Sequence, residues 1–388
     1  MIWLIVVVVV IVGAIAYLES MKVHPSGSGA TQAINVPSSA AGSTVGGASS
    51  STITASLSAI AAADAKAGDQ PAVEIEDPTG FINASSTFTL SSLIGKKVIL
   101  LDFWTYSCIN CIRTLPYLTA WYQKYQNDGL VVVGIHTPEF DFEKNITNVQ
   151  AAVQQYGITY PVVLDSNYGT WDAYGNLYWP HEYLIDIAGY IVHDQIGEGN
   201  YAETEGVIQQ LLAQRATVLG ESGANIPTST VNVALANLSG INSPETYFGA
   251  ARNQYLANGT PSAPGVQNLS IASSPNPALN QLYLGGTWDF ADQYATNQSA
   301  GAKIVYQYDS AKMYFVASGA ATGTTVQVLQ DGKPVTAANE GSDVKNGVLT
   351  VAGSRLYSII NNPDGAGVHT LELIVNQPGL QAFTFTFG

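Results

Sequence analysis

Cysteine is almost absent from this chain, because its 388 residues contain only Cys108 and Cys111. A framework of several structural disulfides is therefore excluded, and any folded domain must be held together by apolar packing. Charge is scarce as well: charged residues make up 11% of the chain, and 14 Lys and Arg face 29 Asp and Glu, for a net charge of −15. Such a balance excludes nucleic acid as a partner, since phosphate binding requires basic patches.

Apolar residues are abundant, at 46% of the chain, and they begin with a run at the N-terminus. Residues 1–18 carry no charged side chain, and their length suits a bilayer, which takes about 17–25 residues. We expect residues 1–20 to form a single N-terminal transmembrane helix that anchors the protein at the extracytoplasmic face of the cell membrane. Ala14-Ile15-Ala16 also resembles a signal-peptide cleavage site, so secretion after cleavage is the alternative.

The segment after this run is dominated by Ser, Gly, Ala and Thr, and residues 25–63 contain no charged side chain. Such a composition offers too little apolar surface to offset the entropy of ordering a chain. We therefore expect residues 21–70 to form a flexible linker.

The next region, residues 71–216, alternates apolar runs rich in β-branched residues with amphipathic stretches. Strand, helix, strand, helix and strand, followed by a hairpin and a last helix, predict an α/β domain with a mixed central sheet. The expected strands are residues 97–104, 130–136, 160–164 and the hairpin 182–197; the expected helices are 112–129, 143–157 and 201–215.

Residues 217–240 are expected to be a linker, and residues 241–388 switch to many short strands. Alternation such as that of Phe383, Phe385 and Phe387, together with the hairpin signal Asp331-Gly332, predicts an all-β sandwich of the jelly-roll kind. One helix is expected at its start, where Ser243 precedes Pro244.

The cysteine pair allows three interpretations. A zinc site needs four ligands, and the chain has no other cysteine and no histidine at the spacing of a zinc module, so we expect no metal. A structural disulfide across two residues closes too short a loop to add much stability. The third interpretation, a dithiol–disulfide couple, fits best because the pair stands between a buried strand and a helix. There the helix N-terminus stabilises a thiolate at Cys108, which attacks a substrate disulfide, and Cys111 resolves the mixed disulfide.

The stretch LDFWTYSCINC resembles the active-site region of thioredoxin-fold proteins. The resemblance implies that Asp102 is the buried carboxylate that helps to deprotonate the resolving thiol. It also implies that Pro180 is a cis-proline beside the disulfide, that Trp179 offers its backbone to the substrate and that Trp104 lines the site. The redox-active disulfide itself would be the only cofactor.

Further motifs narrow the resemblance to the TlpA-like branch, and in particular to the extracytoplasmic half of DipZ-type proteins. They are YGNLYWPHEYLID in the first domain, and SPETYFG, LGGTWDF and FTFG in the second, which is similar to a carbohydrate-binding module. This implies a protein-disulfide reductase that acts on exported disulfide-containing proteins and receives electrons from a separate CcdA-type membrane protein.

Other residues are weaker candidates. His136 and Glu139 follow a predicted strand at its carboxyl end, where open α/β sheets place their sites, and His181 adjoins Pro180; each is expected to modulate the thiols or to bind substrate. The second domain has aromatic residues that either form its core or make a platform for a glycan: Tyr283, Trp288, Tyr306, Tyr308 and Tyr314. A surface-binding protein with an inactive thioredoxin scaffold therefore stays open as the alternative function.

Overall fold

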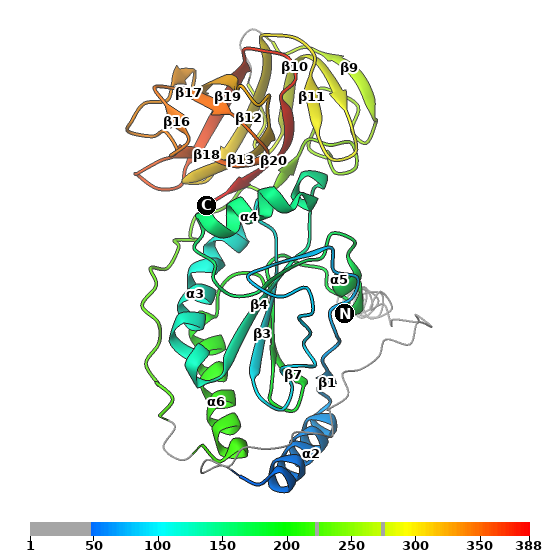
Figure 1. The fold of residues 1–388 in the computed structure, drawn as a ribbon. Helices are drawn as coiled ribbons and strands as arrows, with labels where there is room; N and C mark the ends of the chain where they lie inside the picture. Colours follow the sequence, from blue (N-terminus) through cyan, green and yellow to red (C-terminus); the bar gives the residue numbers. More distant parts are fainter. Residues whose placement is uncertain (1–47, 222–224, 273–275) are drawn as a thin grey trace, which may run out of the picture.

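Two β-sheets organise the chain in the computed structural model, which describes residues 48–221, 225–272 and 276–388 (Figure 1). The first sheet has seven strands in the order β1-β7-β6-β3-β4-β5-β2. Its strands are β1 (Gln70–Pro71), β2 (Gly80–Ile82), β3 (Val98–Trp104), β4 (Leu130–His136), β5 (Val162–Leu164), β6 (His181–Ile185) and β7 (Tyr190–Ile196). β3, β4 and β5 run parallel, while β6 is antiparallel to β3, so the expected mixed α/β sheet is confirmed.

Helices cover both faces of this sheet (Figure 1). They are α3 (Ile109–Tyr125), α4 (Ile146–Gln155), α5 (Gly169–Ala173) and α6 (Tyr201–Leu219), with short 3-10 turns η1 (Gln126–Asp128) and η2 (Asp141–Lys144). The central strand β3 is buried along its whole length. Its even-numbered residues Leu100 and Trp104 share an apolar cluster with Cys111 of α3, whereas Leu101 and Phe103 pack on the opposite face. Strand alternation thus aims Asp102 at the α3 side.

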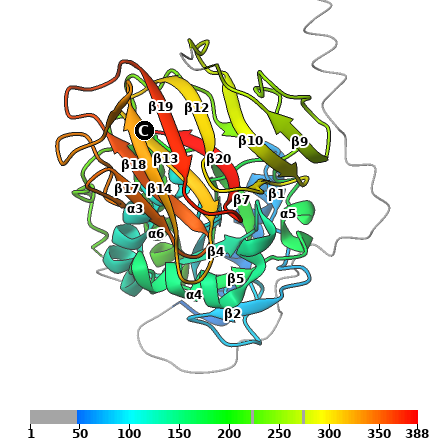
Figure 2. The same ribbon diagram turned by 90° about the horizontal axis from the view of Figure 1, so that it is seen from above.

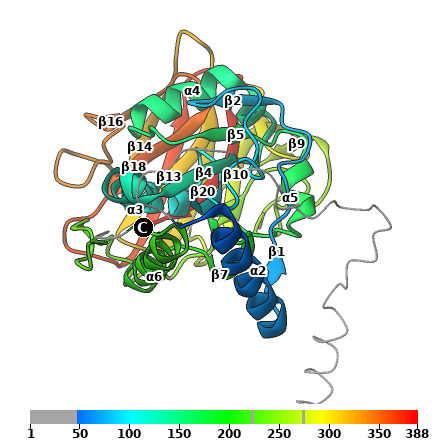
Figure 3. The same cartoon turned by 60° about the horizontal axis from the view of Figure 1, so that its bottom comes forward.

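The predicted flexible linker 21–70 is wrong in its last part, because residues Ser50–Ala67 form helix α2. Ser49 caps the N-terminus and Gly68 ends the helix in the left-handed conformation, which glycine adopts without steric cost. Leu57 packs against Ile187 and Val218, and α2 lies beside α6 (Figure 3), at the end of the molecule remote from the second domain (Figure 1). Local caps and tertiary packing therefore order a segment whose composition alone indicated disorder.

The expected membrane anchor, residues 1–20, lies outside the described residues. Within the described ranges, no helix is both long enough and apolar enough to span a bilayer.

The second domain is all-β, built on one 13-stranded sheet. Its strands are β8 (Thr246–Tyr247), β9 (Gly265–Leu269), β10 (Leu282–Phe290), β11 (Ala295–Asn297), β12 (Ala302–Asp309), β13 (Lys312–Ser318), β14 (Thr324–Gln330), β15 (Lys333–Pro334), β16 (Val344–Lys345), β17 (Val348–Val351), β18 (Arg355–Asn361), β19 (Val368–Val375) and β20 (Gln381–Phe387). The first half of β10 pairs with β12, and its second half lies between β9 on one edge and β11 on the other. The two ends of the sheet approach each other where Glu340, just before β16, bridges to Ile360 of β18. The result is a nearly closed, barrel-like sheet around one apolar core.

One prediction for this domain is wrong, and burial decides between two alternatives for its aromatic residues. The expected helix at Ser243 is absent: its residues enter strand β8, and the Ser243 hydroxyl binds the backbone N–H of Asp309 and the side chain of Asn280. Of the five aromatic residues that either form a core or make a glycan platform, Trp288, Tyr306 and Tyr308 are fully buried in the core, whereas Tyr283 and Tyr314 are half-buried. Aromatic residues at every second position of a strand are compatible with a surface platform and with a core. The burial of Trp288, Tyr306 and Tyr308 assigns these three residues to the core.

The β-rich domain sits on the end of the first sheet where β3 and β4 finish (Figures 1 and 2). Phe140, which follows β4, forms an apolar cluster with Val316 and Phe383 of the β-domain. Beside it, Glu139 Oε1 lies 2.7 Å from Arg252 Nη1. The cysteine-bearing end of the first domain therefore forms the domain interface.

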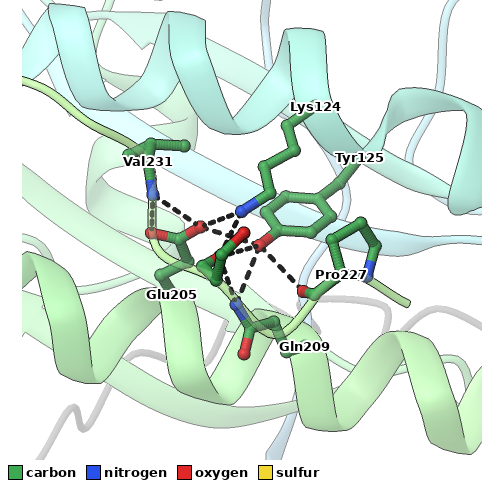
Figure 4. A network of polar contacts seen from close by, with 7 residues as sticks. Lys124, Tyr125, Glu205, Gln209, Pro227 and Val231 are labelled. Carbon is green, nitrogen blue, oxygen red and sulfur yellow. Dashed lines mark hydrogen bonds and ion pairs between the residues drawn. The ribbon is translucent and has the colours of Figure 1, made fainter. Parts of the chain in front are cut away.

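The connection between the domains, expected to be a linker at residues 217–240, is bound to the first domain in its middle (Figure 4). The Glu205 carboxylate of α6 accepts hydrogen bonds from the Val231 N–H at 2.8 Å and from the Tyr125 hydroxyl at 2.7 Å. Lys124 completes the network, 3.0 Å from the same carboxylate. This network fixes the path of the connection along α3 and α6.

Candidate active site

Cys108 and Cys111 lie at the start of α3, with Cys108 as the N-cap residue and Cys111 in the first turn. Both are free thiols; Cys108 is partly exposed, whereas Cys111 is 1% exposed. The backbone N–H of Cys111 points at the Cys108 sulfur, 3.4 Å away. A negative charge on Cys108 is therefore stabilised by an N–H donor and by the helix dipole, and the buried Cys111 lies three residues further on, in the first turn of α3.

Asp102 is buried under this turn, at 1% exposure, in the position that the resemblance implies. Burial raises its pKa to about 8, so the carboxyl group exchanges its proton in the neutral range. Burial also raises the pKa of Cys111 well above its ordinary value, and the neighbouring Cys108 and Asp102 charges add to this effect. Cys111 thus needs a proton acceptor to become a nucleophile, and Asp102 is placed to be one.

The Trp179–Pro180 peptide bond is cis, as the resemblance implies. The Trp179 indole N–H donates to the carbonyl of Thr137 at 3.0 Å, and its ring lies 4.2 Å from that of Trp171. These contacts hold the residue before Pro180 against the loop that follows β4. The adjoining Tyr178 is exposed, so an incoming chain can approach the loop from the surface.

Trp104 and His136 are both buried, and their rings meet edge to face at 5.1 Å. Burial lowers the pKa of His136 to about 3, so this ring is neutral at physiological pH. It also stacks on Tyr106, whose hydroxyl donates to the carbonyl of Ser354 in the β-domain at 3.1 Å. His136 therefore supports the segment that leads to Cys108 through packing.

Glu139 does not face the cysteines: its carboxylate is taken up by Arg252 and by the Tyr247 hydroxyl of the β-domain. A second glutamate nearby, Glu143, lies closer to them. Its Oε1 accepts from the Ser107 hydroxyl at 2.5 Å, immediately before Cys108, and burial raises its pKa to about 7. The sequence alone does not mark Glu143, because this residue lies in an amphipathic stretch, where a glutamate is ordinarily exposed.

His181 lies on the sheet face opposite Cys111. Its Nδ1 is 2.5 Å from Asn176 Oδ1, its Nε2 is 3.1 Å from Asp194 Oδ2, and its ring packs on Tyr183. These partners join the loop before Pro180 to strand β7. The geometry gives His181 a role in holding that loop, without contact to the thiols.

Two further residues of the site escaped the sequence analysis. Glu182, directly after His181, is 2% exposed and pairs with Asp102 across β3 and β6. Arg113 of α3 binds Glu198 with both ends of its guanidinium, at 2.8 and 2.5 Å, and reaches the carbonyl of Phe387 at 3.3 Å. A charged residue inside an apolar strand was the available signal for Glu182, the same one that marked Asp102. Arg113 offered none, because Glu198 and Phe387, which it binds, lie far along the chain.

Zinc-type ligation has no support from the geometry: within the part of the chain that the structure describes, no three His, Cys, Asp or Glu side chains converge as a metal site. The arrangement suits thiol–disulfide exchange instead. From the surface inward, it consists of a partly exposed thiol, a buried thiol and a buried carboxyl group.

Comparisons with known proteins agree with this chemistry. Residues 69–194 match the AhpC/TSA family, and residues 243–388 match the thioredoxin like C-terminal domain. Protein DipZ of Mycobacterium tuberculosis is 39% identical over 322 residues, which cover 82% of this chain and 43% of DipZ. The chain therefore spans less than half the length of that relative.

Shorter relatives match the first domain alone. Thiol-disulfide oxidoreductase YkuV of Bacillus subtilis is 30% identical over 145 residues, which cover 37% of this chain and 96% of YkuV. A solved thioredoxin-like protein in the oxidized form is 30% identical and covers 38% of this chain and 97% of its own, with a TM-score of 0.35.

Proposed function

Because this chain belongs to the thioredoxin-like thiol-disulfide oxidoreductases, we propose that it reduces disulfide bonds of exported proteins at the extracytoplasmic face of a membrane. The observation that carries the proposal is the order of groups at the start of α3. Cys108 is accessible, Cys111 is buried behind it, and Asp102 lies beneath both. This order suits a dithiol that acts on a partner protein in two steps.

In the first step, the Cys108 thiolate attacks a disulfide of the client, so that a mixed disulfide forms and one client thiolate leaves. In the second, Cys111 loses its proton and attacks the Cys108 sulfur, which releases the second client sulfur. The client gains two electrons, and the Cys108–Cys111 pair becomes a disulfide. Pro180 and Trp179 border the place where the client chain lies during both steps.

The proposed clients are exported proteins whose cysteines must stay reduced, including apocytochromes that receive haem. A CcdA-type membrane protein would then return electrons to the Cys108–Cys111 disulfide. The proposed clients rest on the resemblance to the TlpA-like branch, and the proposed donor rests on the likeness to DipZ-type proteins. The apolar run at residues 1–18 suits a membrane tether.

Trapping with Cys111→Ser in native membranes tests the proposal. Without the resolving thiol, mixed disulfides on Cys108 accumulate, and mass spectrometry identifies the donor and the clients. Cys108→Ser with Cys111→Ser is the matched control and should trap nothing. Capture of cytoplasmic proteins alone, or a reduction potential near about −120 mV, typical of a strong oxidant, would overturn the assignment as an extracytoplasmic reductant.

A further inference from the structure

A second buried carboxyl group shares the space under Cys111 with Asp102. Glu182 lies directly opposite Asp102 in the antiparallel pair of β3 and β6, and the two residues are 2% and 1% exposed. Side chains directly opposite each other in such a pair leave the sheet on the same face. Their neighbours on that face, Trp104 and Leu184, belong to the apolar cluster that contains Cys111. Both carboxyl groups therefore point into the layer between the sheet and α3.

Each carboxyl group of this pair has one oxygen atom without a hydrogen-bond partner, Asp102 Oδ1 and Glu182 Oε2. Two polar groups nearby, the Trp104 indole N–H and the Tyr160 hydroxyl, are also fully buried without a partner. Gly134, paired with Asp102 from β4, keeps the space open, because a Cβ there would lie 2.8 Å from Trp104 Nε1. Unpaired polar atoms in an apolar core cost stability, so their gathering at one place indicates a functional role.

Two carboxylates cannot both carry charge at this depth. Burial raises the pKa of Glu182 well above its ordinary value, and the charge of Asp102 raises it further. The pair consequently keeps at least one proton at neutral pH and titrates as a unit.

We propose that Glu182 is a positioning residue for the second step, sharing with Asp102 the proton that Cys111 gives up. The proton leaves the Cys111 thiol for the singly ionised pair as the Cys111–Cys108 bond forms and the bond from Cys108 to the client breaks. The client sulfur departs as a thiolate and takes its proton from solvent. Sharing moves the transferred proton away from the attacking sulfur, which keeps it from returning.

Few other ionisable groups face Glu182. Asp102 acts on it from β3, Tyr160 adjoins it from the segment before β5, and Tyr201 feels its charge from α6. From β7, the residue paired with Glu182 is Gln195, which carries no charge. Cys111 of α3 interacts electrostatically with Asp102 and Tyr160, the two neighbours of Glu182.

The aromatic disulfide 5,5′-dithiobis(2-nitrobenzoate) separates the two steps, because each releases one coloured thionitrobenzoate. Reduced full-length protein is mixed with an excess of this reagent in a stopped-flow instrument between pH 5 and 10. For Glu182→Gln we expect an unchanged first phase. The pH profile of the second-phase rate should show one ionisation instead of two. At pH 7 this rate should be roughly tenfold lower, which is less than the loss expected when a whole general base is removed. Asp186→Asn is the matched control, since Asp186 is a buried carboxyl group at the end of the same hairpin, away from Cys111.

The inference rests on the proposed two-step function, and the two fail differently. Absence of the first phase in the wild-type protein contradicts the two-step chemistry itself. A normal first phase with the same second-phase profile in Glu182→Gln and wild type contradicts the role of Glu182 alone. Should Glu182→Gln not fold, the carboxyl carbon signal of Asp102 is followed by NMR in the wild-type protein. Titration in two steps supports proton sharing, and a single step contradicts it.

Discussion

The two domains bury polar groups in opposite ways. The first holds charged side chains in its interior, among them Asp102, Glu143, Asp165, Glu182, Asp186, Glu205 and Arg215. In the described part of the second, the buried polar residues are Ser, Thr, Asn and Gln, without a buried Asp, Glu, Lys or Arg. Burying an ionisable group costs several kcal/mol unless it is paired or neutralised. The buried charged side chains therefore lower the stability of the first domain and supply its chemistry. The second domain, in its described part, has a core without such side chains and contributes contacts to the first domain.

The difference also shows in how each buried charge is handled. Glu205 and Arg215 have partners that satisfy them, and they hold the chain connections in place. Asp102 and Glu182 have oxygen atoms without partners, and both lie at the cysteines. Asp186, at the far end of the same hairpin, also has one oxygen atom without a partner, so the position of Asp102 and Glu182 beside Cys111, and not the missing partner alone, marks them as functional.

The largest expected effect is the loss of reductase activity in Cys108→Ser. Removing the nucleophile should lower insulin reduction by at least about 10³-fold, because no other thiol can start the exchange. The thermal transition of the β-domain should not move. Substantial activity in this variant would show that Cys108 is not the attacking sulfur.

Next is the pH dependence of stability due to Asp102. Its folded-state pKa of about 8 lies above the ordinary 3.8, so its contribution to stability is fully present below about pH 4 and is lost as the pH rises through 8. Asp102→Asn removes this loss. Between pH 4 and pH 9, the free energy of unfolding of the variant should rise relative to that of the wild type by up to roughly 5 kcal/mol. Urea unfolding of the reduced protein at both pH values measures it. An equal difference at the two values would contradict a raised pKa.

A core substitution in the second domain sharpens the contrast. Trp288 is fully buried, and its indole N–H donates to the carbonyl of Gly285 at 3.1 Å. Trp288→Ala should destabilise this domain by about 3–5 kcal/mol through the cavity it leaves. Both phases of thionitrobenzoate release should keep their rates at a temperature where the variant is folded. A slowed first phase would mean that the core of the β-domain, and not only its surface, shapes the active site.

The smallest expected effect concerns the charge pair between the domains. Arg252 is 39% exposed at its side chain and Glu139 is 11% exposed, so solvent screens much of their attraction. A double-mutant cycle with Arg252→Ala and Glu139→Gln should give a coupling of about 0.5–1 kcal/mol. A coupling near zero would leave the apolar cluster around Phe140 and Phe383 as the main contact.

Local signals in the sequence predicted the first domain well. β-branched runs gave the strands, and an aspartate inside such a run together with the C-x-x-C pair and Pro180 marked the site. Glu182 carries the same signal as Asp102 and was missed, because it follows His181 and Pro180 in a stretch already assigned to a loop and hairpin. The contacts of Glu139 and Tyr106 could not be predicted, since their partners Arg252 and Ser354 are 113 and 248 residues away.

Composition was a poorer guide than local signals. Residues 50–67 have the Ser and Ala content of a linker, yet a Ser49 cap, alanine-rich spacing and a terminal Gly68 make a helix that packs on α6. Aromatic residues at strand spacing gave no means of separating core from platform. Only the closure of the sheet, which depends on distant pairings, decides which face is inside.

A redox titration of the full-length protein shows whether Cys108 and Cys111 act as one dithiol–disulfide couple. The protein is equilibrated in thiol–disulfide buffers of graded potential, and free thiols are counted by alkylation and mass spectrometry. We expect the free thiols of Cys108 and Cys111 to disappear together in one reversible two-electron transition, and we expect mutation of either cysteine to abolish this transition. Two thiols that stay reduced across the whole range, or that oxidise independently, would contradict this expectation.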